Sequence, residues 1–197
     1  MSKEKTTVHV SVIAKEKPPL PDPGDLMAVV AHYQGSLLRY VCRMLGSDNH
    51  EAEDIVQETF VRLHLQLSKE GPDSVKNLTT WLFRTAHNLT IDVFRKGARR
   101  VKVLESASES AVITQEQAAK ELDVMGEVLR QEARQVALRE LGNLEEQYRQ
   151  VVLLKIIQGM TLREVAEVVG ISTSLANYRL NKGLEELTQR LKRAGVV

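Results

Sequence analysis

The chain has 197 residues and is close to neutral, with 27 Lys and Arg against 26 Asp and Glu. This length suits one or two small domains, and few aromatics with abundant Leu, Glu, Arg, Gln and Ala favour helix. No apolar run approaches the roughly 20 residues that span a bilayer, and residues 1–24 lack the apolar core and cleavage site of a secretory signal. The only cysteine, Cys42, excludes an intramolecular disulfide, and we expect a cytoplasmic chain in which it is a small core residue.

Charge is distributed unevenly along the chain. Residues 25–102 hold 11 Lys and Arg against 9 Asp and Glu, and five of these bases fall between residues 95 and 102. Residues 103–138 hold 3 Lys and Arg against 7 Asp and Glu, and residues 139–197 hold 9 Lys and Arg against 7 Asp and Glu. Two weakly basic ends therefore flank an acidic middle. Because affinity for nucleic acid grows with the number of phosphates neutralised, we expect modest DNA binding without a partner.

The N-terminal part of the chain predicts a leader and three helices. Residues 1–24 contain the breaker cluster KPPLPDPG and are typical of a flexible leader. Apolar residues three and four positions apart then predict helices over residues 25–46, about 50–67 and about 78–96. A loop containing Gly71 and Pro72 separates the second helix from the third.

The C-terminal part predicts an acidic linker that leads into a second helical unit. Residues 101–137 begin with a Ser-, Ala- and Glu-rich stretch, and helical character returns from about residue 115. Residues 138–197 then predict a domain whose first helix runs from about residue 144 to 157. The expected fold class is therefore all-α, with two small helical domains joined by a linker.

Residues 161–191 have the pattern of a helix-turn-helix. Thr161 and Glu164 form a capping box, Gly170 suits the left-handed conformation that ends a helix, and Ser172 or Thr173 caps the final helix. An ordinary helical hairpin is the alternative. In a helix-turn-helix the start of the second helix enters the major groove, which makes the following residues candidate DNA readers: Thr173, Ser174, Asn177, Tyr178, Asn181 and Lys182.

One side of the helix at residues 50–67 is polar and mostly acidic, with Glu53, Asp54, Gln57 and Glu58. Carboxylates would repel DNA phosphates, so a protein-docking face is the functional interpretation. A solvated helix face is the alternative. A cation site is disfavoured because no ligating His lies on that side at the right spacing, and we expect no metal site.

The segment WLFRTAHNLTIDVFRKGARR interleaves basic and polar residues with an apolar stripe. Aromatic and basic groups together suit opened or single-stranded nucleic acid. A solvated helix whose basic end stabilises its own dipole is the alternative. His87 is expected at the surface or on the DNA backbone. The candidate DNA contacts of this segment are Trp81, Arg84, Asn88, Asp92, Arg95, Lys96, Arg99 and Arg100.

The order of these segments resembles the extracytoplasmic-function sigma factors of bacterial RNA polymerase. The resemblance rests on DIVQETF, a loop, WLFRTAHNLTIDVFRKGARR, a linker and a C-terminal helix-turn-helix, and it covers about residues 26–100 and 138–192. It implies two helical domains, at residues 25–100 and 138–197. It also implies docking on the core polymerase through Asp54, Ile55, Val56, Gln57, Glu58 and Phe60.

The same resemblance implies how the chain meets promoter DNA. Residues 88–100 would melt and read the minus-ten region, the loop at residues 68–77 would capture a flipped-out base, and the last helix would read the minus-thirty-five region with Arg179 and Lys182 as its basic residues. The acidic linker would thread polymerase channels that normally hold nucleic acid. Core RNA polymerase and promoter DNA are the implied partners, and an anti-sigma protein is a further candidate.

Two other functions fit parts of the sequence. A stand-alone helix-turn-helix regulator would bind duplex operator DNA without polymerase, and its N-terminal domain would sense a ligand or dimerise. A helical adaptor would bind protein alone. An enzyme is not expected, because the sequence has no Ser/His/Asp set, Gly-rich phosphate loop or metal-ligand spacing, and no cofactor is implied.

Overall fold

The computed structural model describes most of the chain in atomic detail. It covers residues 20–46, 49–101 and 124–196, without the side chains of residues 49, 97–101 and 124–130. The expected leader, apart from residues 20–24, and residues 102–123 of the linker expected at residues 101–137 lie outside these described residues.

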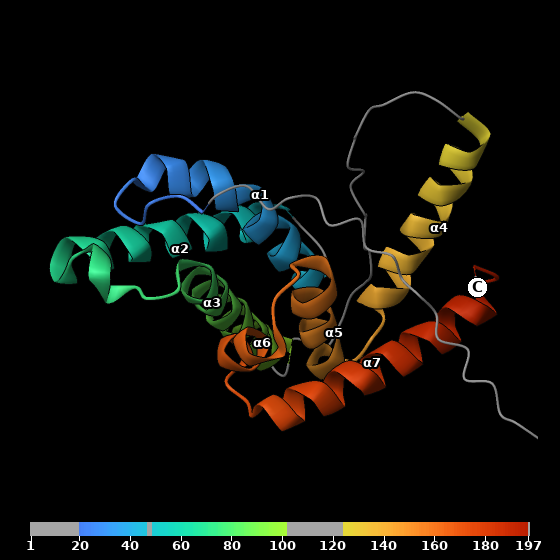
Figure 1. Ribbon diagram of the computed structural model, residues 1–197. Coiled ribbons are helices and arrows are strands. Elements are labelled where there is room, and N and C mark those ends of the chain that lie inside the picture. Colours follow the sequence, from blue (N-terminus) through green and yellow to red (C-terminus); the bar gives the residue numbers. More distant parts are fainter. Residues whose placement is uncertain (1–19, 47–48, 102–123, 197) are drawn as a thin grey trace, which may run out of the picture.

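Within the described residues every regular element is a helix (Figure 1). The all-α prediction is therefore confirmed. The described part of the chain contains seven α-helices: α1 (Leu26–Leu45), α2 (Asn49–Glu70), α3 (Leu78–Val101), α4 (Val124–Gly142), α5 (Glu146–Val152), α6 (Leu162–Val169) and α7 (Thr173–Arg193). A 3-10 turn, η1 (Pro72–Ser74), precedes α3, and a π-helical turn, η2 (Leu153–Ile157), follows α5.

Local signals start and end the helices of the N-terminal half. The Asp25 carboxylate accepts a hydrogen bond from the Ala28 amide at 3.0 Å and caps α1, and Gly46 ends α1 in the left-handed region with φ 73°. Asn77 caps α3 by accepting from the Thr80 amide at 3.0 Å. α3 runs past its predicted end at residue 96, because the Ala and the two Arg residues that follow Gly97 are good helix formers.

The predicted signals of the C-terminal half are confirmed. Thr161 and Glu164 form the capping box of α6, Gly170 ends that helix with φ 73°, and Ser172 caps α7 by accepting from the Leu175 amide at 3.2 Å. One feature differs from the single helix predicted over residues 144–157. The chain widens into η2, where the Gln158 amide donates to the Leu153 carbonyl at 3.1 Å, five residues back.

The two halves of the molecule touch. α1, α2 and α3 pack on one another, α5 and α6 pack on α7, and α3 also lies against α6 (Figure 1). The buried apolar side chains of both halves form one continuous cluster. The two helical units expected from the sequence are therefore present, and α3 and α6 bring them into contact.

Gly183 lies where α7 closely approaches α5. A Cβ atom there would lie 2.8 Å from Cγ2 of Val152 and 3.2 Å from Cβ of Tyr148. Real Cβ atoms do not approach this closely, so any side chain would push α5 away from α7. Glycine is therefore required where these two helices cross.

We expect Gly183→Ala to lower the free energy of unfolding by about 1–3 kcal/mol, the usual cost of overpacking a core. Gly142→Ala is the matched control, because its Cβ would meet nothing within 4 Å. Urea denaturation followed by circular dichroism measures both. Equal stability of the two variants would show that the α5–α7 crossing has room for a side chain.

Candidate polymerase and nucleic-acid interfaces

The six predicted docking residues of α2 divide into three exposed and three buried residues. Asp54, Gln57 and Glu58 are exposed, and Glu58 accepts from Arg62 at 2.8 Å. Their apolar neighbours are buried against the rest of the N-terminal half: Ile55, Val56 and Phe60. The exposed set is available to a partner, whereas the buried set fixes the direction in which α2 presents it.

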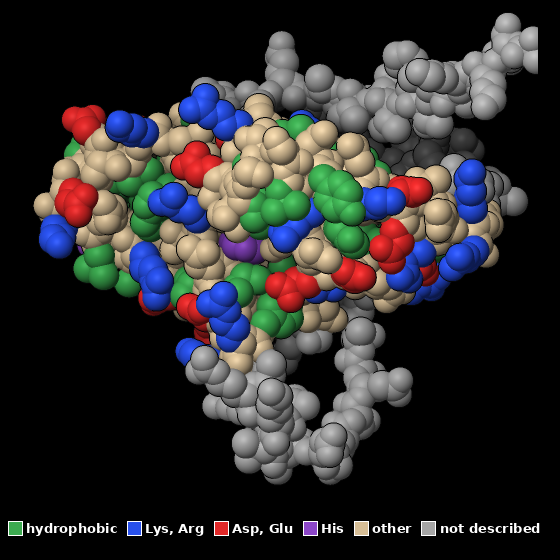
Figure 2. All heavy atoms as spheres, turned by 90° about the horizontal axis from the view of Figure 1, so that it is seen from below, with side chains coloured by type: hydrophobic (Ala, Val, Ile, Leu, Met, Phe, Trp, Pro, Cys, Tyr) green, Lys and Arg blue, Asp and Glu red, His purple; other side chains and the backbone are tan. Residues whose placement is uncertain are grey.

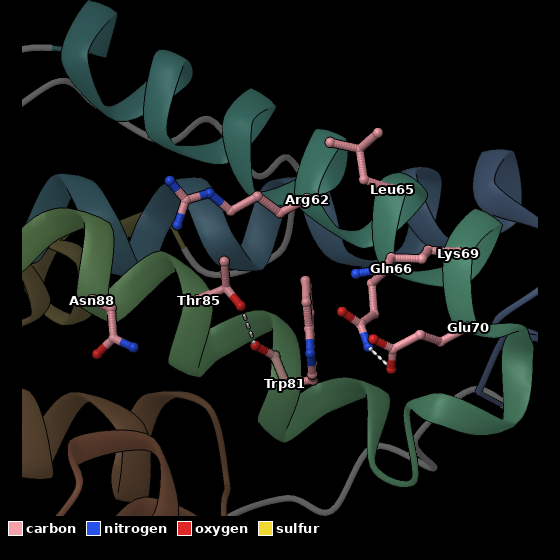
Figure 3. A pocket seen from close by; sticks show the side chains of 8 residues that line it. All are labelled: Arg62, Leu65, Gln66, Lys69, Glu70, Trp81, Thr85 and Asn88. Atoms are coloured by element: carbon pink, nitrogen blue, oxygen red, sulfur yellow. Dashed lines mark hydrogen bonds between the residues drawn. The ribbon is translucent and has the colours of Figure 1, made fainter.

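An open hollow of about 380 Å³ lies between α2 and α3 (Figure 3). The Trp81 side chain rises from α3 towards the α2 side chains, and Gln66 donates to Glu70 at 2.7 Å along one edge. Two of the lining residues, Lys69 and Glu70, belong to the segment expected to capture a base. The lining consists of Arg62, Leu65, Gln66, Lys69, Glu70, Trp81, Thr85 and Asn88.

Apart from Lys69 and Glu70, the α2 side of this hollow was not predicted as a site. Leu65 marks this side of the hollow in the sequence, because it is an apolar residue that stays exposed on the otherwise polar side of α2. Together with Trp81 it places apolar surface beside the positive charges of Arg62 and Lys69. This combination suits a flat, anionic ligand such as an unstacked nucleotide.

The polar stripe of α3 is accessible along most of its described length. Arg84, Asn88, Asp92, Arg95 and Lys96 are exposed. Asp92 lies 3.8 Å from Arg95, and Arg84 lies 3.9 Å from Glu167 of α6. The side chains of the last two predicted contacts, Arg99 and Arg100, lie outside the described residues.

The start of α7 presents most of the predicted groove readers to solvent. Tyr178 is 54% exposed, and Lys182 contacts Glu185 at 2.9 Å, which raises the pKa of its ammonium group. Exposed side chains also include Thr173, Ser174, Asn177 and Asn181. Arg179 is different, because it is half-buried and lines a hollow with Glu145 and Glu146 near the start of α5. The structure therefore separates Arg179 from the other readers.

The face on the underside of Figure 1, towards which α6 and α7 lie, carries mixed charge. Figure 2 shows Lys and Arg side chains interspersed with Asp and Glu side chains, with no continuous basic area. A surface of this kind neutralises few phosphates at once, so its non-specific affinity for DNA is low.

His87 does not lie at the surface, so the prediction made for it is wrong. It is 4% exposed, and its Nδ1 atom lies 2.9 Å from the Tyr40 hydroxyl. Tyr40 also packs edge-on against Phe83, with 5.6 Å between ring centroids. Burial lowers the pKa of His87 to about 4, so the imidazole is neutral at physiological pH.

The described part of the chain contains no group of three or more His, Cys, Asp and Glu side chains that could hold a metal ion. None of the helices it contains is both long and apolar enough to cross a bilayer.

Family models match both halves of the chain. The model of sigma-70 region 2 matches residues 29–100, which hold α2, α3 and the hollow between them. The model of sigma-70 region 4 matches residues 134–187, which hold the helix-turn-helix. The extracytoplasmic-function (ECF) RNA polymerase sigma factor SigW of Bacillus subtilis is 30% identical over 166 residues, 83% of this chain and 87% of SigW. The chain belongs to the ECF group of the sigma-70 family.

Further relatives agree with this assignment. This sigma factor is 28% identical to the ECF sigma factor SigM of Bacillus subtilis, over 81% of its own length and 88% of that of SigM. Among solved structures it resembles CnrH, in complex with the cytosolic domain of CnrY, with a TM-score of 0.56 and 25% identity over 85% of this chain and 88% of that one.

A second solved structure shares the fold. It is the sigma factor RpoE of Bartonella quintana, in complex with the anti-sigma factor NepR, with a TM-score of 0.68 and 20% identity over 85% of this chain and 97% of that one. The prediction of an ECF-type sigma fold, with a helix-turn-helix at its C-terminal end, is confirmed.

The buried His87 predicts how the stability of this sigma factor depends on pH. Above pH 6.5 the imidazole is neutral in both the folded and the unfolded chain. Between pH 6.5 and about 4 the unfolded chain binds a proton that the folded chain does not, so stability falls as the pH falls. From pH 7 to pH 5 we expect His87 to lower the free energy of unfolding by about 1–2 kcal/mol.

Urea denaturation at the two pH values measures this loss. In His87→Phe the fall in unfolding free energy between pH 7 and pH 5 should be smaller than in the wild type by about 1–2 kcal/mol. The control is His64→Gln, which changes an exposed histidine of α2 and should leave this fall as in the wild type. An unchanged loss in His87→Phe would contradict the assignment of a neutral, buried imidazole.

Proposed function

We propose that this sigma factor binds core RNA polymerase, directs it to specific promoters and helps to open them, acting by binding alone and not as an enzyme. The observation that supports this most strongly is the presence, in one chain, of two matched units with different exposed surfaces. One unit carries an acidic face and a tryptophan-lined hollow. The other carries a helix-turn-helix with an exposed second helix.

In this proposal α2 docks on the polymerase through Asp54, Gln57 and Glu58. Their carboxylates and amide suit a basic or polar partner surface. Ile55, Val56 and Phe60 act indirectly, because they are buried and hold α2 in the orientation that presents the exposed set. A stand-alone regulator would have no use for this face.

The opened promoter strand is proposed to bind along α3 and the hollow. Trp81 offers a ring on which a base can stack, and Asn88 offers both a donor and an acceptor for a base edge. Arg84, Arg95 and Lys96 are exposed and can neutralise phosphates. Arg99 and Arg100, which follow on α3, would extend the basic track, and Asp92 would orient Arg95.

The start of α7 is proposed to read the minus-thirty-five region in the major groove. Asn177 and Asn181 can each pair with an adenine, and Lys182 can reach a guanine or a phosphate. Thr173, Ser174 and Tyr178 would contact the sugar-phosphate backbone or base edges. Arg179 would contribute only after turning away from Glu145 and Glu146.

The partners follow from this function. Bacterial core polymerase and promoter DNA lie in the cytoplasm, so we propose the same location for the chain. An anti-sigma protein, implied by the resemblance of the sequence, stays a prediction. Such a partner would cover surfaces that polymerase needs.

Transcription with purified components tests the proposal. The chain is mixed with core polymerase and a pooled promoter library, and the transcripts are sequenced. We expect discrete start sites that appear only when the chain is added. The absence of transcripts, together with tight binding of the chain alone to duplex DNA, would favour the stand-alone regulator.

Paired variants separate docking from DNA reading on the promoters so found. Asp54→Ala with Gln57→Ala should weaken binding to core polymerase and lower transcription. Asn177→Ala with Lys182→Ala should lower transcription about tenfold or more, because two base contacts are lost, and should leave polymerase binding unchanged. A protein-only adaptor predicts no effect from the second pair, and a stand-alone regulator predicts none from the first.

Promoter opening is tested with Asn88→Ala. Asn88 is exposed, so its loss spares the fold, and losing its contacts with the opened strand should lower the fraction of open promoter about fivefold. Trp81→Ala should lower it further through loss of stacking. Permanganate reactivity of unpaired thymines measures opening, and Gln131→Ala on the exposed side of α4 is the control. Normal promoter opening in the Asn88 and Trp81 variants would show that α3 does not melt the promoter.

A further inference from the structure

Two large apolar side chains stay exposed at the start of α7, the second helix of the helix-turn-helix. Leu175 is 38% exposed and Tyr178 is 54% exposed, whereas Ala176 and Leu180 of the same helix are buried in the core. A single exposed apolar residue is common on protein surfaces and needs no explanation. Here two of them adjoin, because positions three apart are neighbours on a helix surface. Both belong to the part of α7 that is proposed to enter the major groove.

The surface residues at the start of α7 form two parallel strips, because residues spaced by three and then four positions share one line along a helix. The first strip is apolar apart from an ammonium group at its end, and it consists of Leu175, Tyr178 and Lys182. The second strip is polar, has the same spacing and lies beside the first, and it consists of Ser174, Asn177 and Asn181.

The packing of α7 keeps the apolar strip at the surface. The Ser172 hydroxyl accepts from the Leu175 amide at 3.2 Å, which fixes the first turn of the helix. Ala176 and Gly183 are buried on the other side of α7, and Gly183 meets α5 there. Rotation of α7 about its axis would break this packing. The exposed apolar surface is therefore a fixed feature of the helix.

The same part of α7 carries little charge with which to hold DNA. The only bases at residues 173–182 are Arg179 and Lys182. Arg179 is half-buried beside an acidic hollow at the start of α5, and Lys182 contacts Glu185 at 2.9 Å. Few phosphates can be neutralised by such a surface. Contacts with the edges of the bases must therefore provide most of the discrimination at this helix.

The major groove offers one apolar group that suits such a strip. Thymine presents its C5-methyl group there, beside its O4 acceptor, and adenine presents one donor and one acceptor. Asparagine can pair with adenine, and apolar side chains pack on the thymine methyl group. The two strips of α7 therefore match the two bases of A·T pairs, since the polar strip suits adenine and the apolar strip suits thymine.

We propose that Leu175 and Tyr178 are specificity-determining residues that contact thymine methyl groups in the minus-thirty-five element. The inference rests on the promoter-binding function proposed above and adds the chemistry of one contact to it. Leu175 was not among the DNA readers predicted from the sequence. Tyr178 acts through its ring and not through its hydroxyl group. The promoters of this sigma factor therefore carry thymine where these two side chains meet the groove.

Replacement of thymine by deoxyuridine tests the proposal, because it removes the C5-methyl group and keeps the hydrogen-bonding groups of the base. The full chain is mixed with core polymerase and two copies of one promoter from the library experiment. One copy has thymine in its minus-thirty-five element and the other has deoxyuridine. The copies give transcripts of different length and compete in one tube. We expect the thymine copy to be favoured about threefold to fivefold for each methyl group contacted.

Variants of the two side chains connect this preference to α7. In Leu175→Ala the preference at one thymine should fall to about one, because the methyl group loses its apolar partner. Leu175→Met keeps an apolar side chain of similar volume and should retain the preference. Tyr178→Ala should remove the preference at a neighbouring thymine, and Tyr178→Phe should retain it. Circular dichroism verifies that each variant is folded.

Two matched controls make the result specific. Ile156→Ala changes another exposed apolar residue of the C-terminal half, which lies in η2 and outside the helix-turn-helix. This variant should keep the wild-type preference for thymine, whatever its total transcription. Deoxyuridine placed between the two promoter elements is the control for the DNA, and it should not affect the competition.

Three results would overturn the proposal. They are equal use of the two templates by the wild-type chain, an unchanged preference in both Leu175→Ala and Tyr178→Ala, and a minus-thirty-five element without A·T pairs. In each of them the chain still directs transcription, so the sigma function stands. Failure of that function is distinguishable, because it would appear as the absence of chain-dependent transcripts in the library experiment.

Discussion

Burial of the apolar face of α3 is the interaction on which the other surfaces depend. Leu82, Phe83 and Ala86 are almost completely buried in the core with α1 and α2. Since successive residues of a helix turn by a fixed angle, this burial also fixes where the remaining sides point. Trp81 is directed to the hollow beside α2, and Arg84 is directed to α6. One packing arrangement thus sets the strand-binding surface and the contact between the halves.

Polar groups make this packing more specific. The Tyr40 hydroxyl and the His87 imidazole satisfy each other in the core, which avoids the cost of burying either without a partner. The guanidinium of Arg149 donates to carbonyl groups in the last turns of α1 and α4. These contacts work only at one orientation of the helices. They favour a single arrangement over others that bury a similar apolar area.

Local features of this fold could be predicted from the sequence, and contacts between distant residues could not. The capping box of Thr161 and Glu164 and the turn at Gly170 follow from residues a few positions apart. His87 lies on a helix with many polar residues, and its burial depends on Tyr40, 47 positions away. Likewise, nothing near Arg149 in the sequence points to Met44, 105 positions away. The six docking residues predicted on α2 were only partly correct as a surface. The sequence did not show that three of them, Ile55, Val56 and Phe60, are buried.

We propose that one chain carries two DNA-contacting surfaces, which act at promoter segments about 25 base pairs apart, or about 85 Å at roughly 3.4 Å per pair. Site-specific photo-cross-linking measures this directly, with a photoreactive amino acid at Asn88 of α3 or at Asn181 of α7 in the complex of chain, core polymerase and promoter. We expect cross-links near minus ten from position 88 and near minus thirty-five from position 181. Cross-links from both positions to the same segment, or from neither position to DNA, would contradict it.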